Sequence, residues 1–117
     1  FLLLSNSDAL LRILNDIDRK SIGATIDTGH VFQAKEHLPT VAQKLSKKLF
    51  HVHLDDNYGD WDDDLALGTV HNFLSFFRVL RDVGYKGYLC LDIWPIDDPD
   101  EAAAESKRYV EETMKAL

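Results

Sequence analysis

Histidine and aspartate residues gather in three short stretches of the 117-residue chain. The stretches are Asp27-Thr28-Gly29-His30, His51-Val52-His53-Leu54-Asp55-Asp56, and Asp92. Imidazole nitrogens mixed with carboxylate oxygens suit Mn²⁺, Zn²⁺, Co²⁺ or Fe²⁺ better than Ca²⁺, which prefers oxygen donors alone. A bound divalent ion would also reduce the repulsion between neighbouring carboxylates. These residue types therefore predict a divalent metal site, provided that the fold brings the three stretches together.

Each stretch ends a short apolar run that predicts a β-strand, over residues 23–28, 49–55 and 88–94. Apolar residues at helical spacing predict helices around these strands. The helix faces consist of Leu10, Ile13, Leu14 and Ile17, of Leu38, Val41, Ala42 and Leu45, of Phe73, Phe76, Phe77 and Leu80, and of Val110, Met114 and Leu117. Ser5, Ser7 or Asp8 could cap the first helix, and Asp98-Pro99 begins the last. The order α-β-α-β-α-β-α favours a parallel sheet.

Alternating side chains divide the predicted strands into an apolar face and a polar one. In the second strand, Phe50, Val52 and Leu54 oppose Leu49, His51, His53 and Asp55. A doubly wound sheet needs two apolar faces, whereas a closed barrel can turn its polar face inward. A (β/α)₈ barrel takes about 250 residues, so three strands and four helices make less than half of one. We therefore expect an α/β fold in which residues 1–117 form a single segment, the C-terminal part of a TIM-type barrel.

Each residue of the predicted site has a simpler explanation when it is considered alone. Asp27 before Thr28-Gly29 could cap a turn, and His53 could be a hydrogen-bonded histidine of the core. The acidic run over residues 60–64 is typical of a solvated loop. Metal binding is favoured because three consecutive predicted strands end in ligand-type residues at the carboxyl edge, where ligands bind in such folds.

Composition and charge narrow the classes of partner. The net charge of −7 disfavours a nucleic-acid partner, and no apolar run approaches the roughly 20 residues that span a bilayer. The single cysteine, Cys90, fits a reducing compartment, most simply the cytoplasm. Phe1-Leu2-Leu3-Leu4 is too short for a signal peptide and lacks a basic flank. Since the chain does not begin with Met, we expect a processed chain or a segment of a longer one.

Several motifs together resemble a known protein family. They are Asp27-Thr-Gly-His30, His51-Val-His53-Leu-Asp-Asp, Leu67-Gly68-Thr69, and Gly84-Tyr85-x-Gly87 ahead of Leu91-Asp92. This pattern is similar to that of the xylose isomerase-like TIM barrels. These include the sugar phosphate isomerases and epimerases and, more remotely, the apurinic-site endonucleases such as endonuclease IV. The resemblance covers nearly the whole chain but only the last three βα units of the family.

The resemblance implies roles for several of these side chains. Asp27 and His53 would bind the metal ion, and His30 would contact the ion or the substrate. Asp92 stands where the family has a metal-binding, acid/base glutamate, and its shorter side chain would displace the carboxylate by roughly 1 Å. Asp62-Asp63-Asp64 stands where the endonucleases have an Asp-x-His pair. The family's other metal-binding glutamate would lie upstream of this chain.

The function expected from this resemblance is metal-dependent isomerisation or epimerisation of a sugar, sugar phosphate or polyol. Mn²⁺, Zn²⁺ or Co²⁺ would polarise a carbonyl while Asp92 moves the neighbouring proton. His30, Trp61 and Trp94 would contact the sugar. The alternatives are an endonuclease IV-like phosphodiesterase or a dehydratase, and a degenerate barrel module without catalysis. Because an open fragment leaves strand edges unpaired, we expect a homo-oligomer or a requirement for the N-terminal barrel units.

Overall fold

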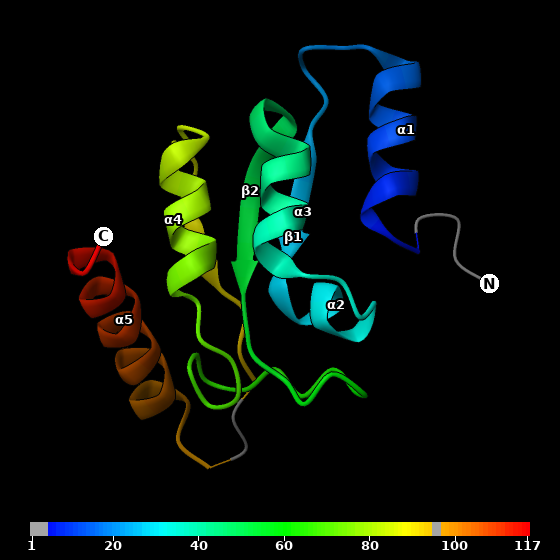
Figure 1. The fold of residues 1–117 in the computed structure, drawn as a ribbon. Helices are drawn as coiled ribbons and strands as arrows, with labels where there is room; N and C mark the ends of the chain where they lie inside the picture. The colour runs from blue at the N-terminus through cyan, green and yellow to red at the C-terminus, as the bar shows by residue number, and fades with distance from the viewer. Residues whose placement is uncertain (1–4, 95–96) are drawn as a thin grey trace.

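A three-stranded parallel sheet flanked by helices forms the chain in a computed structural model, which describes residues 5–94 and 97–117 (Figure 1). The strands are β1 (Ala24–Asp27), β2 (Leu49–Leu54) and β3 (Leu89–Leu91). The helices are α1 (Ser7–Ile17), α2 (Thr28–Gln33), α3 (Leu38–Leu45), α4 (Leu74–Asp82) and α5 (Pro99–Lys115), with a 3₁₀ turn at Ser46–Lys48. The predicted alternation of strands and helices is confirmed, with one helix more than expected among the described residues.

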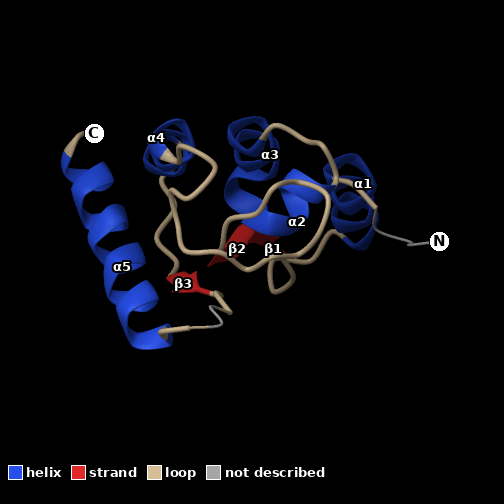
Figure 2. Cartoon of the chain, turned by 90° about the horizontal axis from the view of Figure 1, so that it is seen from below, coloured by secondary structure: helices blue, strands red, loops and turns tan. Residues whose placement is uncertain are grey.

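The sheet has the order β1-β2-β3, so each strand lies beside its neighbour in the sequence. Asp27 is paired with His53, and His53 with Cys90. Figure 2 shows α1, α3 and α4 on the same side of the strands, and α5 beside the β3 edge of the sheet. Helices that lie on the same side of a parallel sheet are the arrangement expected for part of a barrel wall.

The core lies between the sheet and these helices. Ala24, Ile26, Val52 and Leu54 are buried on the helix side of the sheet, as the strand alternation predicts. Phe50 departs from the prediction, because its side chain is 48% exposed while that of Leu49 is buried. The register shifts between Ala24 and Thr25, so that Leu49 pairs with Ala24 and His51 with Thr25. This shift omits Phe50 from the pairing and reverses the expected faces at the start of β2.

Helices α3 and α4 use the predicted apolar faces. Leu38, Val41, Ala42 and Leu45 are buried in α3, and Pro39 lies in its first turn, where a missing N–H costs no hydrogen bond. The face of α4 is buried in the same way, and consists of Phe73, Phe76, Phe77 and Leu80. Gly84 follows α4 with φ +72°, a backbone conformation that favours glycine.

In the two outer helices, α1 and α5, the structure differs in detail from the sequence prediction. Asn6, rather than Ser5, Ser7 or Asp8, caps α1 by accepting a hydrogen bond from Ala9 N at 2.9 Å. Asp98 caps α5 as predicted. Met114, expected on the inner face of α5, is largely exposed, whereas Ser106 is buried. The apolar run at residues 1–4, judged from the sequence to be too short for a signal peptide, lies outside the described residues.

None of the helices in residues 5–94 and 97–117 combines the length and apolar character needed to cross a membrane.

Candidate metal centre

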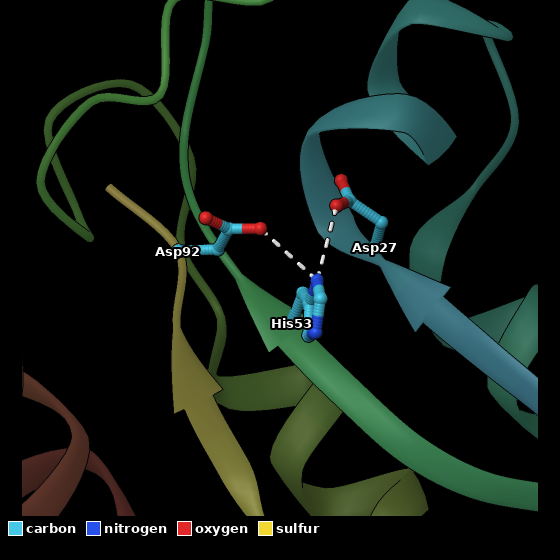
Figure 3. Close-up of side chains that lie close together, drawn as sticks. All are labelled: Asp27, His53 and Asp92. Carbon is cyan, nitrogen blue, oxygen red and sulfur yellow. Dashed lines mark ion pairs between the residues drawn. The ribbon is translucent and has the colours of Figure 1, made fainter. Parts of the chain in front are cut away.

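The carboxyl ends of the three strands bring Asp27, His53 and Asp92 together (Figure 3). Asp27 is the last residue of β1, and His53 is its paired residue in β2. Asp92 directly follows β3, where its N–H donates to Leu54 O at 2.9 Å. Because parallel strands end at the same edge of the sheet, residues separated by 65 positions along the chain become neighbours.

The distances within this group suit a divalent ion. His53 Nδ1 lies 3.0 Å from Asp92 Oδ2 and 3.7 Å from Asp27 Oδ2. One donor atom from each residue lies within 4.8 Å of the others. Metal–nitrogen and metal–oxygen bonds are about 2.0–2.2 Å long, so donors at these separations can face one ion. One imidazole and two carboxylates form the mixed donor set predicted from the sequence.

Asp27 uses its two carboxylate oxygens separately. Oδ1 accepts a hydrogen bond from His30 N at 3.1 Å and so caps α2, which begins at the next residue. Oδ2 is the oxygen nearest to His53. The turn-capping explanation and the metal-ligand explanation for Asp27 are therefore compatible.

His30 lies in the first turn of α2 and faces the acidic loop, which we define as residues 57–64. Its Nε2 is 3.0 Å from Asp62 Oδ2, and its Nδ1 is 3.9 Å from Asp27 Oδ1. Burial alone would lower the pKa of His30, but the charge of Asp27 and the hydrogen bond and charge of Asp62 outweigh it and raise the pKa above its ordinary value. His30 is mostly exposed, so its ring is accessible from solvent.

A second group of carboxylates, formed by Asp55, Asp62 and Asp64, was not predicted as a site. One oxygen from each lies within 4.8 Å of the others. Asp55 is 1% exposed, and its Oδ1 accepts hydrogen bonds from Gly29 N at 2.8 Å and Thr28 Oγ1 at 3.0 Å. Among the described residues, Asp55 Oδ2 and Asp62 Oδ1 are buried without a hydrogen-bond partner. This second group can also hold a cation, through oxygen donors alone.

Burial and the close approach of the carboxylates raise pKa values in the second group. Burial raises the pKa of Asp55 to about 7; the Gly29 and Thr28 hydrogen bonds oppose the rise, whereas the charges of Asp27 and Asp62 add to it. Burial also raises the pKa of Asp64, with further contributions from Asp62 and Asp92. Two signals in the sequence pointed here: Asp55 directly follows the second strand, and Asp62 and Asp64 alternate along the acidic run. An acidic run alone is more typical of a solvated loop than of a binding site.

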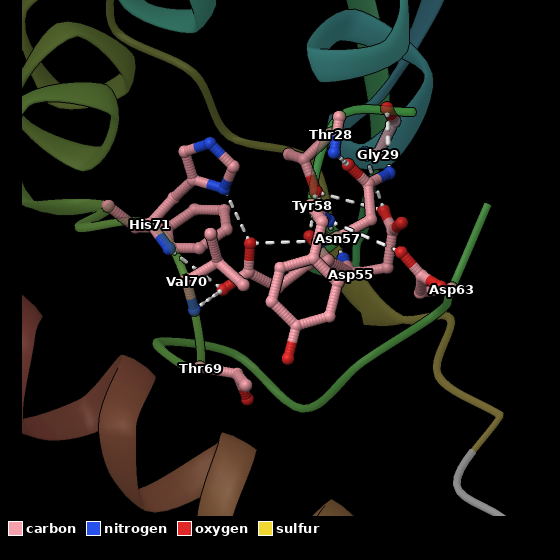
Figure 4. Close-up of polar contacts among 12 residues, drawn as sticks. Thr28, Gly29, Asp55, Asn57, Tyr58, Asp63, Thr69, Val70 and His71 are labelled. Atoms are coloured by element: carbon pink, nitrogen blue, oxygen red, sulfur yellow. Dashed lines mark hydrogen bonds and ion pairs between the residues drawn. The ribbon is translucent and has the colours of Figure 1, made fainter. Parts of the chain in front are cut away.

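Asp56 and Asn57 hold the acidic loop in place through hydrogen bonds. Figure 4 shows Asn57 and His71 among these contacts. Asn57 donates from Nδ2 to Gly29 O at 3.0 Å and accepts from Gly59 N at 2.8 Å. Lys35, which lies just after α2, donates to Gly59 O and to Asp60 Oδ1. The loop is thus attached to Gly29 of α2 and to Lys35 just after that helix, and Asp62 lies beside His30.

The two tryptophans predicted to contact substrate are exposed. Trp61 is 75% exposed within the acidic loop, and Trp94 is 79% exposed after β3. Trp94 N donates to Asp64 O at 2.8 Å, so the segment after β3 is tied to the acidic loop. Both rings are therefore available to a ligand, but the contact predicted for them remains untested.

Comparison with known proteins identifies sequence relatives of this chain. The chain is 33% identical over 107 residues to the uncharacterized protein MJ1311 of Methanocaldococcus jannaschii, which covers 89% of this chain and 36% of that protein. It is also 34% identical over 77 residues to the uncharacterized protein MJ1614 of the same organism, covering 65% of this chain and 30% of that protein. The chain therefore spans about a third of the length of these curated relatives.

A solved structure shares both the fold and the sequence. The crystal structure of a D-tagatose 3-epimerase-like protein superposes with a TM-score of 0.78 at 30% sequence identity, covering 95% of this chain and 43% of that one. The three strands and their helices thus match part of a TIM barrel, as the sequence predicted. The sequence model of the xylose isomerase-like TIM barrel family matches residues 2–113. The chain belongs to the xylose isomerase-like TIM barrel family.

Proposed function

We propose that this chain supplies part of the active site of a metal-dependent isomerase or epimerase that acts on a sugar, a sugar phosphate or a polyol. The observation that carries the proposal is the convergence of Asp27, His53 and Asp92 at the carboxyl ends of three parallel strands. Membership of the xylose isomerase-like family and the likeness to an epimerase-like structure support the reaction class. The lone Cys90 supports action in the cytoplasm.

Asp27, His53 and Asp92 would hold a divalent ion, Mn²⁺, Zn²⁺ or Co²⁺, whose chemistry is that of a Lewis acid toward a substrate oxygen. Asp92 is the most exposed of the three and is the residue we assign to proton transfer next to the carbonyl carbon. Because its pKa is raised, His30 is protonated to a greater extent near neutral pH than an ordinary histidine, and it can donate a hydrogen bond to a substrate oxygen. The exposed ring faces of Trp61 and Trp94 can pack against the C–H face of a sugar.

Proton exchange with solvent tests this proposal. The intact protein loaded with Mn²⁺ is incubated in D₂O with a panel of ketoses, aldoses and cyclic polyols, and deuterium incorporation is followed by NMR. We expect deuterium at the carbon next to the carbonyl, and a loss of at least 100-fold in Asp27→Ala, because the carbonyl loses its polarising ion. Asp16→Ala, an exposed change in α1, is the matched control. Equal exchange in Asp27→Ala and the control contradicts the assignment.

Metal-assisted hydrolysis of a phosphodiester is the second candidate function. The second carboxylate group favours it, since two ions held close together can stabilise both the attacking and the leaving oxygen. The net charge of −7 disfavours a polyanionic substrate and ranks this reaction second. Hydrolysis of a small chromogenic phosphodiester by the intact protein, with two ions bound for each active site and no deuterium incorporation into sugars, would favour it over isomerisation.

A further inference from the structure

Asp56 is a fully buried carboxylate whose two oxygens accept four hydrogen bonds. Oδ1 accepts from Asn57 N at 3.0 Å and from His71 Nδ1 at 2.7 Å. Oδ2 accepts from Val70 N at 2.7 Å and from His71 N at 3.0 Å. A buried carboxylate with this many donors is fully satisfied, so it can hold the segments that supply the donors in a fixed arrangement.

The same residue closes the base of the acidic loop. Asp56 N donates to Leu65 O at 3.0 Å, and Leu65 N donates to Asp56 O at 2.7 Å. These two bonds form an isolated antiparallel bridge across residues 57–64. The backbone of Asp56 therefore fixes both ends of the loop that carries Asp62 and Asp64, while its side chain fixes residues 70 and 71 beneath it.

His71 connects this arrangement to α2. Its ring stacks on Phe32, with ring centroids 3.7 Å apart and planes inclined by 11°. Phe32 lies in the helix that Asp27 caps and that carries His30. Neither Asp56 nor His71 belongs to the Asp27–His53–Asp92 group, yet together they join the acidic loop to the helix that begins at this group.

We propose that Asp56 and His71 are positioning residues of the metal centre, and that the hydrogen bond from His71 Nδ1 to Asp56 sets the placement of Asp62 and Asp64 beside Asp27, His53 and Asp92. This inference rests on the proposed function. Hydrogen-bonded groups that orient the residues around a metal affect its affinity by about 10-fold to 100-fold when they are removed. The carboxylates of the acidic loop also contribute to the negative potential that attracts the ion.

A matched set of substitutions separates the hydrogen bond from the stacking. His71→Phe keeps a ring that can stack on Phe32 but removes the donor to Asp56. His71→Asn keeps an N–H donor at nearly the same place and removes the ring. His37→Phe, an equivalent change at an exposed histidine at the start of α3, is the control.

The measurement is the Mn²⁺ affinity of the intact protein, determined by competition with a chromogenic chelator well below the Tm of every variant. We expect a loss of about 10-fold in His71→Phe, and less than a 3-fold change in His71→Asn and in His37→Phe. An unchanged affinity in His71→Phe, with only a lower Tm, would show a merely structural role and overturn the inference. Equal losses in His71→Phe and His71→Asn would overturn the role of the hydrogen bond.

Amide hydrogen exchange of the metal-free protein tests the placement of the acidic loop independently of Mn²⁺ affinity. His71→Phe should accelerate amide exchange in residues 57–64 and leave exchange in α1 unchanged. Faster exchange in both places would indicate a general loss of stability and would overturn the inference. Absence of Mn²⁺ binding in the wild type would contradict the proposed function and this inference together, whereas binding that is insensitive to His71→Phe contradicts the inference alone.

Discussion

At the scale of single residues, the carboxyl edge of the sheet depends on aspartates that each make more than one contact. Asp27 caps α2 with one oxygen and faces His53 with the other, and Asp55 binds Gly29 and Thr28 while one of its oxygens has no partner among the described residues. A substitution at either position therefore changes both local structure and electrostatics. Isosteric variants can separate the two effects.

Asp27→Asn should separate capping from metal binding. An asparagine oxygen can still accept the hydrogen bond from His30 N, so the free energy of unfolding of the metal-free protein should fall by no more than about 0.5 kcal/mol. Asp27→Ala removes the cap as well and should cost about 1 kcal/mol more. Both variants should lose the ion because both lack the carboxylate charge. Urea denaturation and metal analysis of the same preparations check this, and full metal content in Asp27→Asn would refute it.

Asp92→Glu should restore the carboxylate length that the family resemblance implies at this position. We expect the ion to be retained and the rate of proton exchange to rise, by about 10-fold or more, since displacements of roughly 1 Å change rates strongly. Asp92→Asn should abolish exchange. The measurement is deuterium incorporation into the substrate by NMR. A site without catalysis would show no exchange in the wild type or in Asp92→Glu.

The raised pKa of Asp55 predicts how the stability of the metal-free protein depends on pH. The pKa is about 7 in the folded chain, above the ordinary aspartate value of 3.8 that applies to the unfolded chain. The folded state therefore binds the proton more tightly, and this contribution to stability is lost as the pH rises through about 7.

Asp55→Asn removes that dependence, because the amide stays neutral and still offers an oxygen to Gly29 N. The variant should be more stable than the wild type at pH 8 and show no such advantage at pH 4. Urea denaturation at the two pH values measures the difference. A constant difference between the two proteins across this range would contradict the prediction.

At the scale of elements, the sequence predicts the strands and the longer helices because their signals are local. Buried apolar periodicity marks α3 and α4, and short apolar runs mark β1 to β3. Helix α2 was missed because its six residues are too few for a periodic pattern. The exposure of Phe50 was missed because a register shift depends on the pairing with β1 rather than on β2 alone.

The candidate site likewise combines residues that local sequence signals predict with residues that only tertiary contacts bring together. The convergence of Asp27, His53 and Asp92 could be predicted, since strand ends in a parallel sheet lie at one edge. The group formed by Asp55, Asp62 and Asp64 could not, because it requires the acidic loop to fold back over the sheet. The tertiary hydrogen bonds of Asp56 and Asn57 bring the loop there, and residue spacing does not reveal them.

Gly29→Ala tests the close packing between α2 and the end of β2. A Cβ at this position would lie 1.8 Å from Asp55 Oδ2 and 2.8 Å from Asn57 Nδ2, so the elements would have to separate. We expect a loss of about 1–3 kcal/mol in the free energy of unfolding. Gly29→Ala/Asp55→Ala should lose less than the sum of the two single changes, because the clash is relieved. If denaturant titrations show that the two losses simply add, the close approach of residue 29 to Asp55 is not the cause of the destabilisation.

At the scale of the whole molecule, the described residues match one part of a TIM barrel. Helices α1, α3 and α4 lie on one side of the sheet, and the chain spans about a third of the length of its curated relatives. We propose that residues 1–117 are a single barrel segment and that the complete active site needs further barrel units. As three ligands, Asp27, His53 and Asp92 would leave coordination positions for other groups, as in catalytic rather than structural metal sites.

Metal content is the most direct test of the central claim, that Asp27, His53 and Asp92 bind a divalent ion. The intact protein is purified without chelators and analysed by mass spectrometry beside Asp27→Ala/His53→Ala. The control is Asp16→Ala/His37→Ala, which removes the same residue types at exposed positions away from the site. We predict near-stoichiometric Mn, Zn or Co in the wild type and the control, and none in Asp27→Ala/His53→Ala. Equal metal content in all three proteins, or no metal in any of them, would contradict the account.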